Sequence, residues 1–419
     1  MKKFLNAIIV LIAFHSNSLI SQEVEETVVV TSALIDTSQI TNPLYVIDGQ
    51  DIADDATTSL GDAIDSYLGV SIADYGAAVG QPIIRGMSGP RVKILKNGMV
   101  NRDVSGLGVD HLNDVDLNDI SQLEIVKGPS SLLYANGTIG GIINVVDECI
   151  SAINYELPEL KVGYETQSVN DGDSKNINYK SNIGGFNINF GHNKIDFGNY
   201  DVPFGAVLHD EDHDEHDEHD EHDGHEEDEH HEEDMGFINN SDYAVEATKF
   251  GISKVGDWGY VGISVDNLES VYGIPFHGDE HGDEHGDDHE DHEDEEEHEE
   301  HGDERIFSTT DSESTTIKGS YNVNGNIVNN IDFTFRNSDY TLTEAHEEEE
   351  GHDDHGDEEE EHAPTVFANE AIEYGAIFDI SNENLSQKVA INFVDEDNSI
   401  VGEEAFMNPA NSEEFTIGY

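Results

Sequence analysis

The sequence predicts a small α/β domain followed by an antiparallel transmembrane β-barrel, and three observations lead to this fold class. Residues 22–150 mix β-branched runs with helical and glycine-rich stretches, whereas apolar and polar residues alternate in strand-like segments over residues 151–419. Segments of about ten residues with this alternation are typical of barrels that cross a membrane, although a soluble β-sandwich shows the same pattern. The connections favour the barrel, because short turns and long links alternate strictly along the chain.

The first domain is expected to contain short strands and one helix. Apolar residues at helical spacing, among them Leu60, Ala63 and Ile64, predict a helix over residues 54–68. Asn97-Gly98 predicts the tight turn of a hairpin. β-branched and apolar runs predict strands at 27–31, 44–47, 91–95, 123–126 and 142–146.

Ten strands are expected after residue 155. Four short links, at residues 183–184, 256–257, 324–325 and 382–383, alternate with three long ones. Because successive connections lie at opposite ends of an antiparallel sheet, all three long links are expected on one side of the membrane. The strand candidates are 158–167, 174–182, 185–195, 243–255, 258–269, 306–322, 326–342, 366–380, 385–397 and 412–419.

Residues 1–21 are typical of a secretory signal peptide. Lys2 and Lys3 precede the apolar stretch 5–14, and small serines follow it. The stretch is too short to span a membrane, so we expect an exported mature chain that begins near residue 22.

The net charge of −74 is concentrated in three runs, at residues 209–234, 277–304 and 344–362. These runs hold 46 of the 92 acidic residues and 19 of the 22 histidines, and they occupy the three long links. A nucleic-acid-binding protein needs a basic surface, which 18 Lys and Arg do not provide here. The mean hydropathy of −0.52 argues against an α-helical membrane protein, and the single cysteine, Cys149, excludes a disulfide scaffold.

The histidines of these runs point to metal binding. Imidazole nitrogen binds zinc, copper and nickel well, and carboxylate oxygen completes such sites, whereas purely acidic loops would suit calcium. The alternative interpretation is a solvated low-complexity insert with no ligand role. The regularly spaced candidates are His213, His216, His219, His222 and His225, every third residue, and His277, His281, His285 and His289, every fourth.

Several motifs resemble those of TonB-dependent outer-membrane receptors. Thr27-Val28-Val29-Val30-Thr31 resembles the box that binds TonB, and Arg85-Gly86 resembles an early motif of the plug domain. The stretch 123–129, continued by Gly140-Gly141 and residues 142–146, resembles the plug signature. Within the family the chain is most similar to zinc receptors. They carry an aspartate-histidine pair where this sequence has Asp110-His111, which would otherwise be an ordinary polar loop pair.

This resemblance implies a TonB box and plug domain over residues 22–150 and the N-terminal part of a barrel over 151–419. Barrels of the family have 22 strands, so ten strands imply a fragment or a truncated product. The implied protein lies among the lipids of a Gram-negative outer membrane, works with the TonB complex and imports a divalent metal ion, zinc before copper or nickel. It has no enzyme activity and no catalytic cofactor. Two alternatives remain: a surface metal buffer or sensor, and a receptor for a metal chelate such as a siderophore.

Overall fold

The computed structural model describes residues 44–54, 59–75, 78–108, 111–127, 138–204, 206, 236–275, 305–323, 325, 327–347, 363–380, 387–402 and 405–418. All of them belong to one structural unit, which spans residues 31–419. The expected signal segment 1–21 and the TonB-box-like segment Thr27–Thr31 lie outside the described residues, as do 209–234, 277–304 and 348–362 of the acidic runs.

A five-stranded mixed sheet forms the centre of the N-terminal domain, with the order β1-β6-β7-β4-β5. Strands β4 and β7 pair in parallel, and the other neighbours pair antiparallel. The expected turn Asn97-Gly98 joins β4 to β5, and both residues have positive φ, 53° and 84°. The strands are β1 (Leu44–Asp48), β4 (Val92–Lys96), β5 (Met99–Val100), β6 (Ile120–Lys127) and β7 (Gly141–Asp147).

The prediction of a helix over residues 54–68 is wrong for the part of this range that the structure describes. The structure has a one-and-a-half-turn helix, α2 (Gly49–Asp54), and then irregular turns over residues 59–69. The hydroxyl of Ser59 accepts a hydrogen bond from Asp62 N at 3.1 Å, and Gly61 packs so closely against Gly80 that a helix with a side chain there would clash. The apolar residues that suggested the helix are nevertheless buried, because Leu60, Ala63 and Ile64 belong to the core of the domain.

A hairpin that the sequence pattern did not reveal, β2 (Val70–Tyr75) and β3 (Val79–Ile84), adds a second small sheet. A 3-10 turn, η2 (Gly89–Arg91), precedes β4. The core combines residues from these parts with Ile47, Ile94, Ile120, Leu123, Ile125, Ile143 and Val145 of the five-stranded sheet. No helix among the described residues is long and apolar enough to cross a membrane.

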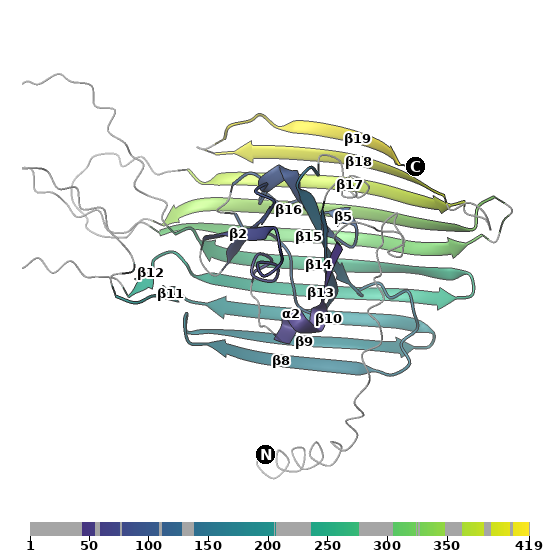
Figure 1. Cartoon of the computed structure of the whole chain (residues 1–419), viewed down its shortest axis with the longest axis horizontal. Helices are drawn as coiled ribbons and strands as arrows, with labels where there is room; N and C mark the ends of the chain where they lie inside the picture. Colours follow the sequence, from purple (N-terminus) through teal and green to yellow (C-terminus); the bar gives the residue numbers. More distant parts are fainter. Residues whose placement is uncertain are drawn as a thin grey trace, which may run out of the picture. The chain divides into compact units, whose positions relative to one another are not determined.

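Ten antiparallel strands form one large sheet in sequence order, from β8 at one edge to β19 at the other (Figure 1). All ten expected strands are confirmed within a few residues at each end. They are β8 (Glu159–Gln167), β9 (Gly172–Ile183), β10 (Phe186–Phe197), β13 (Tyr243–Gly256), β14 (Gly259–Gly273), β15 (Arg305–Asn322), β16 (Asn330–Glu347), β17 (Thr365–Asp379), β18 (Lys388–Val401) and β19 (Ala410–Gly418).

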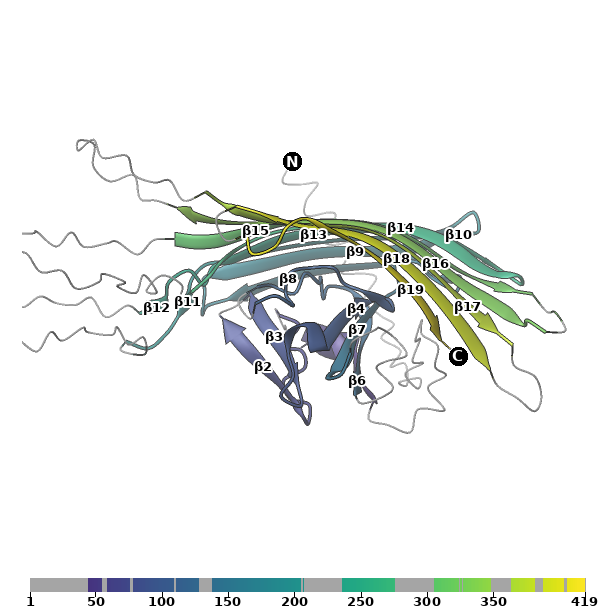
Figure 2. The same ribbon diagram turned by 90° about the horizontal axis from the view of Figure 1, so that it is seen from above.

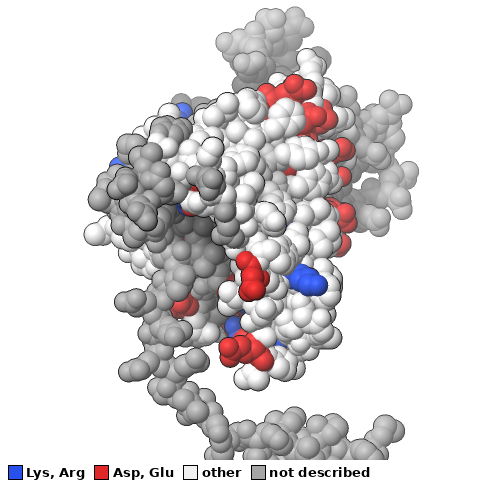
Figure 3. Space-filling view, turned by 90° about the vertical axis from the view of Figure 1, so that its right-hand side faces the viewer, with Lys and Arg blue, Asp and Glu red and all other residues white. Residues whose placement is uncertain are grey.

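Short turns follow β9, β13, β15 and β17, all at one end of the sheet. The first is formed by Gly184 and Gly185, both with positive φ, a conformation that glycine adopts without strain. The strand ends that flank the three acidic runs lie at the other end, where the small hairpin of β11 (Tyr200–Asp201) and β12 (Phe237–Ile238) also lies. At the end with the short turns, most of the described surface is uncharged (Figure 3).

The two faces of the large sheet differ as the alternation predicts. The sheet is curved, and the N-terminal domain lies on its concave side (Figure 2). Polar residues such as Asn189 and Ser253 face the concave side, where they donate hydrogen bonds to the carbonyls of Glu148 and Ser151 in the segment that joins the domain to the sheet. Phe250, Ile263 and Val265 are 40–48% exposed on the opposite face. Apolar residues therefore point outward and polar residues point inward, as in barrels that cross a membrane.

Candidate functional site

Asp103 closes the loop that carries His111. Its Oδ1 accepts hydrogen bonds from Ser105 N at 3.2 Å and from Ser105 Oγ at 2.5 Å. Its Oδ2 accepts from Asn101 Nδ2 at 2.8 Å and from Asp114 N at 3.0 Å. One carboxylate thus joins the two ends of the loop, residues 103 and 114, although this segment forms no strand or helix in its described parts.

His111 is buried between this loop and the large sheet, with 7% of its surface exposed. The side chain of Gln81 on β3 donates to the His111 carbonyl at 3.2 Å and to the Ser105 carbonyl at 2.5 Å. The imidazole lies edge-on to Phe367 of β17, with 5.8 Å between the ring centroids. The loop therefore holds His111 by its backbone and leaves the ring beside an aromatic side chain of the sheet.

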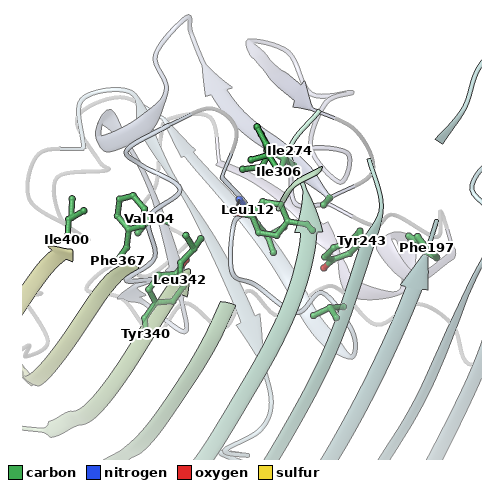
Figure 4. Close-up of a cluster of buried hydrophobic side chains, with 14 residues drawn as sticks. Val104, Leu112, Phe197, Tyr243, Ile274, Ile306, Tyr340, Leu342, Phe367 and Ile400 are labelled. Carbon is green, nitrogen blue, oxygen red and sulfur yellow. Dashed lines mark hydrogen bonds between the residues drawn. The ribbon is translucent and has the colours of Figure 1, made fainter. Parts of the chain in front are cut away.

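The residue after His111 ties the loop directly to the sheet. Leu112 N donates to the hydroxyl of Tyr272 on β14 at 3.3 Å, and Leu112 packs in a buried apolar cluster with Tyr272, Ile274 and Ile306 (Figure 4). Further members come from other strands of the sheet, most of them near the strand ends, and from the N-terminal domain. They are Phe197, Tyr243, Val245, Tyr340, Leu342, Phe367 and Ile400 of the sheet, and Ala78, Val79 and Val104 of the domain.

The position of this cluster relates His111 to the acidic runs. Ile274 and Ile306 flank the run at 277–304, and Leu342 and Phe367 flank the run at 344–362. Phe197 and Tyr243 stand on either side of 209–234 in the same way. The segment that contains His111 is thus packed against the end of the sheet to which all three His- and acid-rich runs are attached.

Ion pairs fix the N-terminal domain against the sheet farther from this end. Lys96 Nζ lies 2.8 Å from Asp266 Oδ1, and Lys180 Nζ lies 3.1 Å from Asp119 Oδ2. The Arg102 guanidinium lies 2.7 Å from Glu396. Asn118 and Asn178 exchange two side-chain hydrogen bonds, at 3.1 and 3.2 Å. Polar contacts therefore link the domain to strands on both sides of the sheet.

A buried carboxylate lies inside the motif of residues 123–129. Glu124 is fully buried and accepts hydrogen bonds from Gln122 Nε2 at 2.6 Å and from Asn144 Nδ2 at 2.9 Å. Burial raises the pKa of Glu124, and the two amide donors oppose this rise. The contacts of Glu124 lie within the domain, so they give it a structural role there.

Of the expected metal ligands, the structure describes only His111. Asp110 lies outside the described residues, as do the regularly spaced histidines His213, His216, His219, His222, His225, His277, His281, His285 and His289. Among the residues that are described, no group of three or more His, Cys, Asp or Glu could hold a metal ion. Sequence reasoning also missed Gln81 and Asp114, for which neither spacing nor motif provides a signal.

The comparisons with known proteins agree with the architecture of the N-terminal domain. Residues 36–142 match the model of the TonB-dependent Receptor Plug Domain. A hemin receptor from Yersinia enterocolitica is 29% identical over 152 residues, which are 35% of this chain and 21% of that protein. The vitamin B12 transporter BtuB of Vibrio vulnificus (strain CMCP6) is 27% identical over 154 residues, 35% of this chain and 25% of that protein.

Solved structures show the same fold over most of the chain. The copper transporter OprC superposes with a TM-score of 0.63 and 11% identity, over 89% of this chain and 50% of that one. The Serratia marcescens hemophore receptor HasR gives a TM-score of 0.61 with 11% identity, over 89% of this chain and 48% of that one. The chain thus spans about a quarter or less of these curated relatives and about half of these structures. Its residues 36–142 thus match the plug domain of TonB-dependent receptors, and they are joined to an antiparallel sheet that has the fold of these solved structures.

Proposed function

We propose that this protein is a TonB-dependent outer-membrane receptor that imports a divalent metal ion, with zinc as its first candidate. The observation that carries the proposal is the position of His111. This histidine of the plug domain is packed against the end of the sheet where the three His- and acid-rich runs are attached. Ions collected by the runs would have a short route to the plug.

The chemistry of the candidate ligands favours a borderline metal. Imidazole and carboxylate together suit zinc, and they also suit copper and nickel. We propose Asp110 and His111 as the plug ligands, with histidines of the runs as weaker capture sites. The runs also carry a high density of negative charge, which raises the local concentration of divalent cations.

Two further features support a membrane receptor that is driven by TonB. The outward face of the sheet exposes Phe250, Ile263 and Val265, which suit contact with lipid. Residues Thr27–Thr31 form a β-branched run ahead of the plug, and such a segment can bind a partner by adding a strand to its sheet. Opening a path through the barrel requires force and no covalent chemistry, so we expect no enzyme activity.

The proposal is tested by zinc uptake into cells that produce the full chain. His111→Ala should reduce saturable uptake of radioactive zinc, while His192→Ala should not. His192 is a matched control because it lies on β10, away from the loop of His111, with Nδ1 3.0 Å from the hydroxyl of Thr248. Its side chain points to the face of the sheet opposite that of the inward-facing Asn193. Deletion of Thr27–Thr31 should abolish uptake but leave zinc binding to the purified protein intact.

Other results of this experiment would count against specific parts of the proposal. Equal uptake by wild type and His111→Ala would remove His111 from the route. If copper or nickel competed for uptake more effectively than zinc, the imported ion would be that metal and not zinc. Binding without any uptake would favour a surface buffer or sensor, and stimulation only by a metal chelate would favour a chelate receptor.

A further inference from the structure

A polar cavity lies between the plug domain and the large sheet. Its volume is about 60 Å³, and residues of both parts line it, among them Asn101 and Asp114 from the plug and Ser312, Ser338 and Tyr340 from the sheet. A buried water needs about 10–15 Å³ by this measure, so the cavity has room for about four waters. The space is therefore large and polar enough to hold a partly hydrated ion.

The cationic side chains that line this cavity are already paired with carboxylates. Each of the four forms an ion pair with an acidic side chain other than Asp114. The pairs are Lys96–Asp266 at 2.8 Å, Arg102–Glu396 at 2.7 Å, Lys249–Asp116 at 3.8 Å and Arg336–Glu373 at 3.1 Å.

Asp114 is a buried carboxylate of this cavity that belongs to none of these pairs. It is 92% buried, and its Oδ1 accepts no hydrogen bond from any residue that the structure describes. Burial raises the pKa of Asp114 to about 7, and the nearby carboxylates of Asp103 and Asp311 raise it further, against the opposing effects of Ser312 and Lys96. A buried carboxylate is stabilised either by a proton or by a cation, and here the negative surroundings favour positive charge.

We propose that this cavity is an internal binding site for a partly hydrated divalent cation, with Asp114 as its carboxylate ligand. The hydroxyl of Ser312 and water molecules supply the other oxygens. Divalent cations that prefer oxygen bind in this way, through one or two carboxylates and several waters. A single carboxylate makes the site weak and readily exchangeable, which agrees with the absence of a larger ligand group among the described side chains.

The site differs from the candidate site at His111 in both ligands and location. The proposed ligands at Asp114 are oxygen atoms, and Asp114 follows His111 by three residues, on the other side of the bonds that Leu112 and Asn113 make to Tyr272 and Gly80. Cation binding at Asp114 therefore does not depend on import of zinc.

Terbium(III) luminescence tests this site in the purified full chain. Terbium prefers oxygen ligands and emits strongly when an excited tyrosine lies within several ångströms, and Tyr340 lines the cavity. The three acidic runs contain no tyrosine or tryptophan, so ions bound within them have no sensitiser of their own. At about pH 8, where the Asp114 carboxyl is largely ionised, we expect a saturable sensitised emission that calcium displaces.

Variants then assign the emission to Asp114. Asp114→Asn should weaken terbium binding by about tenfold or more, as expected for loss of the only carboxylate ligand. Asp339→Asn removes the same charge from an exposed residue lining the same cavity and should retain binding. Asp114→Glu should restore binding, which separates loss of the ligand from misfolding, and Tyr340→Phe should reduce the emission.

The outcomes also separate this proposal from the proposed function. His111→Ala should keep the terbium signal whether or not it lowers zinc uptake. Absence of sensitised emission from the wild type, or equal effects of Asp114→Asn and Asp339→Asn, would overturn the proposal. If the wild type shows no sensitised emission, Asp114 holds a proton in place of a cation.

Discussion

Arg102 of the plug domain and Glu396 of β18 are 294 positions apart in sequence, yet their side chains form a 2.7 Å ion pair. Glu373 of β17 joins them, 3.8 Å from Arg102 and 3.1 Å from Arg336 of β16. The side chains of the four residues are 6–21% exposed. Two guanidinium groups and two carboxylates thus compensate each other where the plug meets three neighbouring strands.

Breaking this cluster should loosen the plug. Arg102→Met leaves two largely buried carboxylates with one guanidinium, and removing one partner of a buried pair costs about 3–5 kcal/mol. We expect a lower midpoint in urea unfolding and faster proteolysis of the plug in the folded protein. Lys194→Met is the control, because its pair with Glu246 is 54% exposed on both sides and contributes about 0–1 kcal/mol. Equal effects of the two variants would contradict a buried cluster, and Glu396→Gln added to Arg102→Met should recover part of the loss.

The stability of the protein should depend on pH through Asp114. Its pKa rises from 3.8 in the unfolded chain to about 7 in the folded protein, so the folded state binds the proton more tightly. Wild type therefore loses stability as the pH rises from about 4 through about 7, whereas Asp114→Asn does not lose this contribution. In metal-free buffer, the variant should gain up to about 4 kcal/mol over wild type above pH 7 and nothing at about pH 4. Urea unfolding at several pH values measures this, and a gain that is constant with pH would contradict it.

Gly251 on β13 marks a close contact between the sheet and the segment that joins it to the plug. A Cβ at Gly251 would lie 2.0 Å from the carbonyl oxygen of Cys149, so Gly251→Ala must displace backbone. We expect a loss of about 1–3 kcal/mol, seen as a lower melting temperature. Gly375→Ala on β17 is the matched control, because its Cβ would meet its nearest atoms at 3.5 Å, an ordinary contact. A melting temperature lowered equally by both substitutions would show that the contact with Cys149 is not responsible.

Tyr272 should position the loop that carries His111. Tyr272→Phe removes the hydroxyl that accepts the hydrogen bond of Leu112 N at 3.3 Å, and it leaves that buried amide without this partner. If His111 binds zinc, the affinity of the purified protein should fall by several-fold, which corresponds to about 1 kcal/mol. Tyr243→Phe changes another tyrosine of the same apolar cluster and should leave the affinity close to that of wild type. An unchanged affinity in Tyr272→Phe would show that this bond does not position the site.

Much of the large sheet follows from the sequence alone. Alternation of period two places Ile263 and Val265 on one face and Ser264 on the other, because successive side chains of a strand point in opposite directions. The alternation of short and long links then sets the order of the strands and the end to which the acidic runs are attached. In the plug domain, the same local reasoning finds β1 and the turn at Asn97-Gly98, but it gives a helix over 54–68 where tight packing of Gly61 against Gly80 favours turns.

The relationships between distant residues were decided by the tertiary structure. The parallel pairing of β4 with β7, the pair Arg102–Glu396, the contact of His111 with Phe367 and the burial of Asp114 all join segments that no local pattern connects. Periodicity records which face of a strand is apolar, and it contains no information on which distant residue that face will meet. The sequence by itself therefore determined the strands, their order and the concentration of His and acidic residues in the three runs. Only the fold decided that His111 lies beside the end of the sheet that carries those runs and that Asp114 is buried in the cavity between the plug and the sheet.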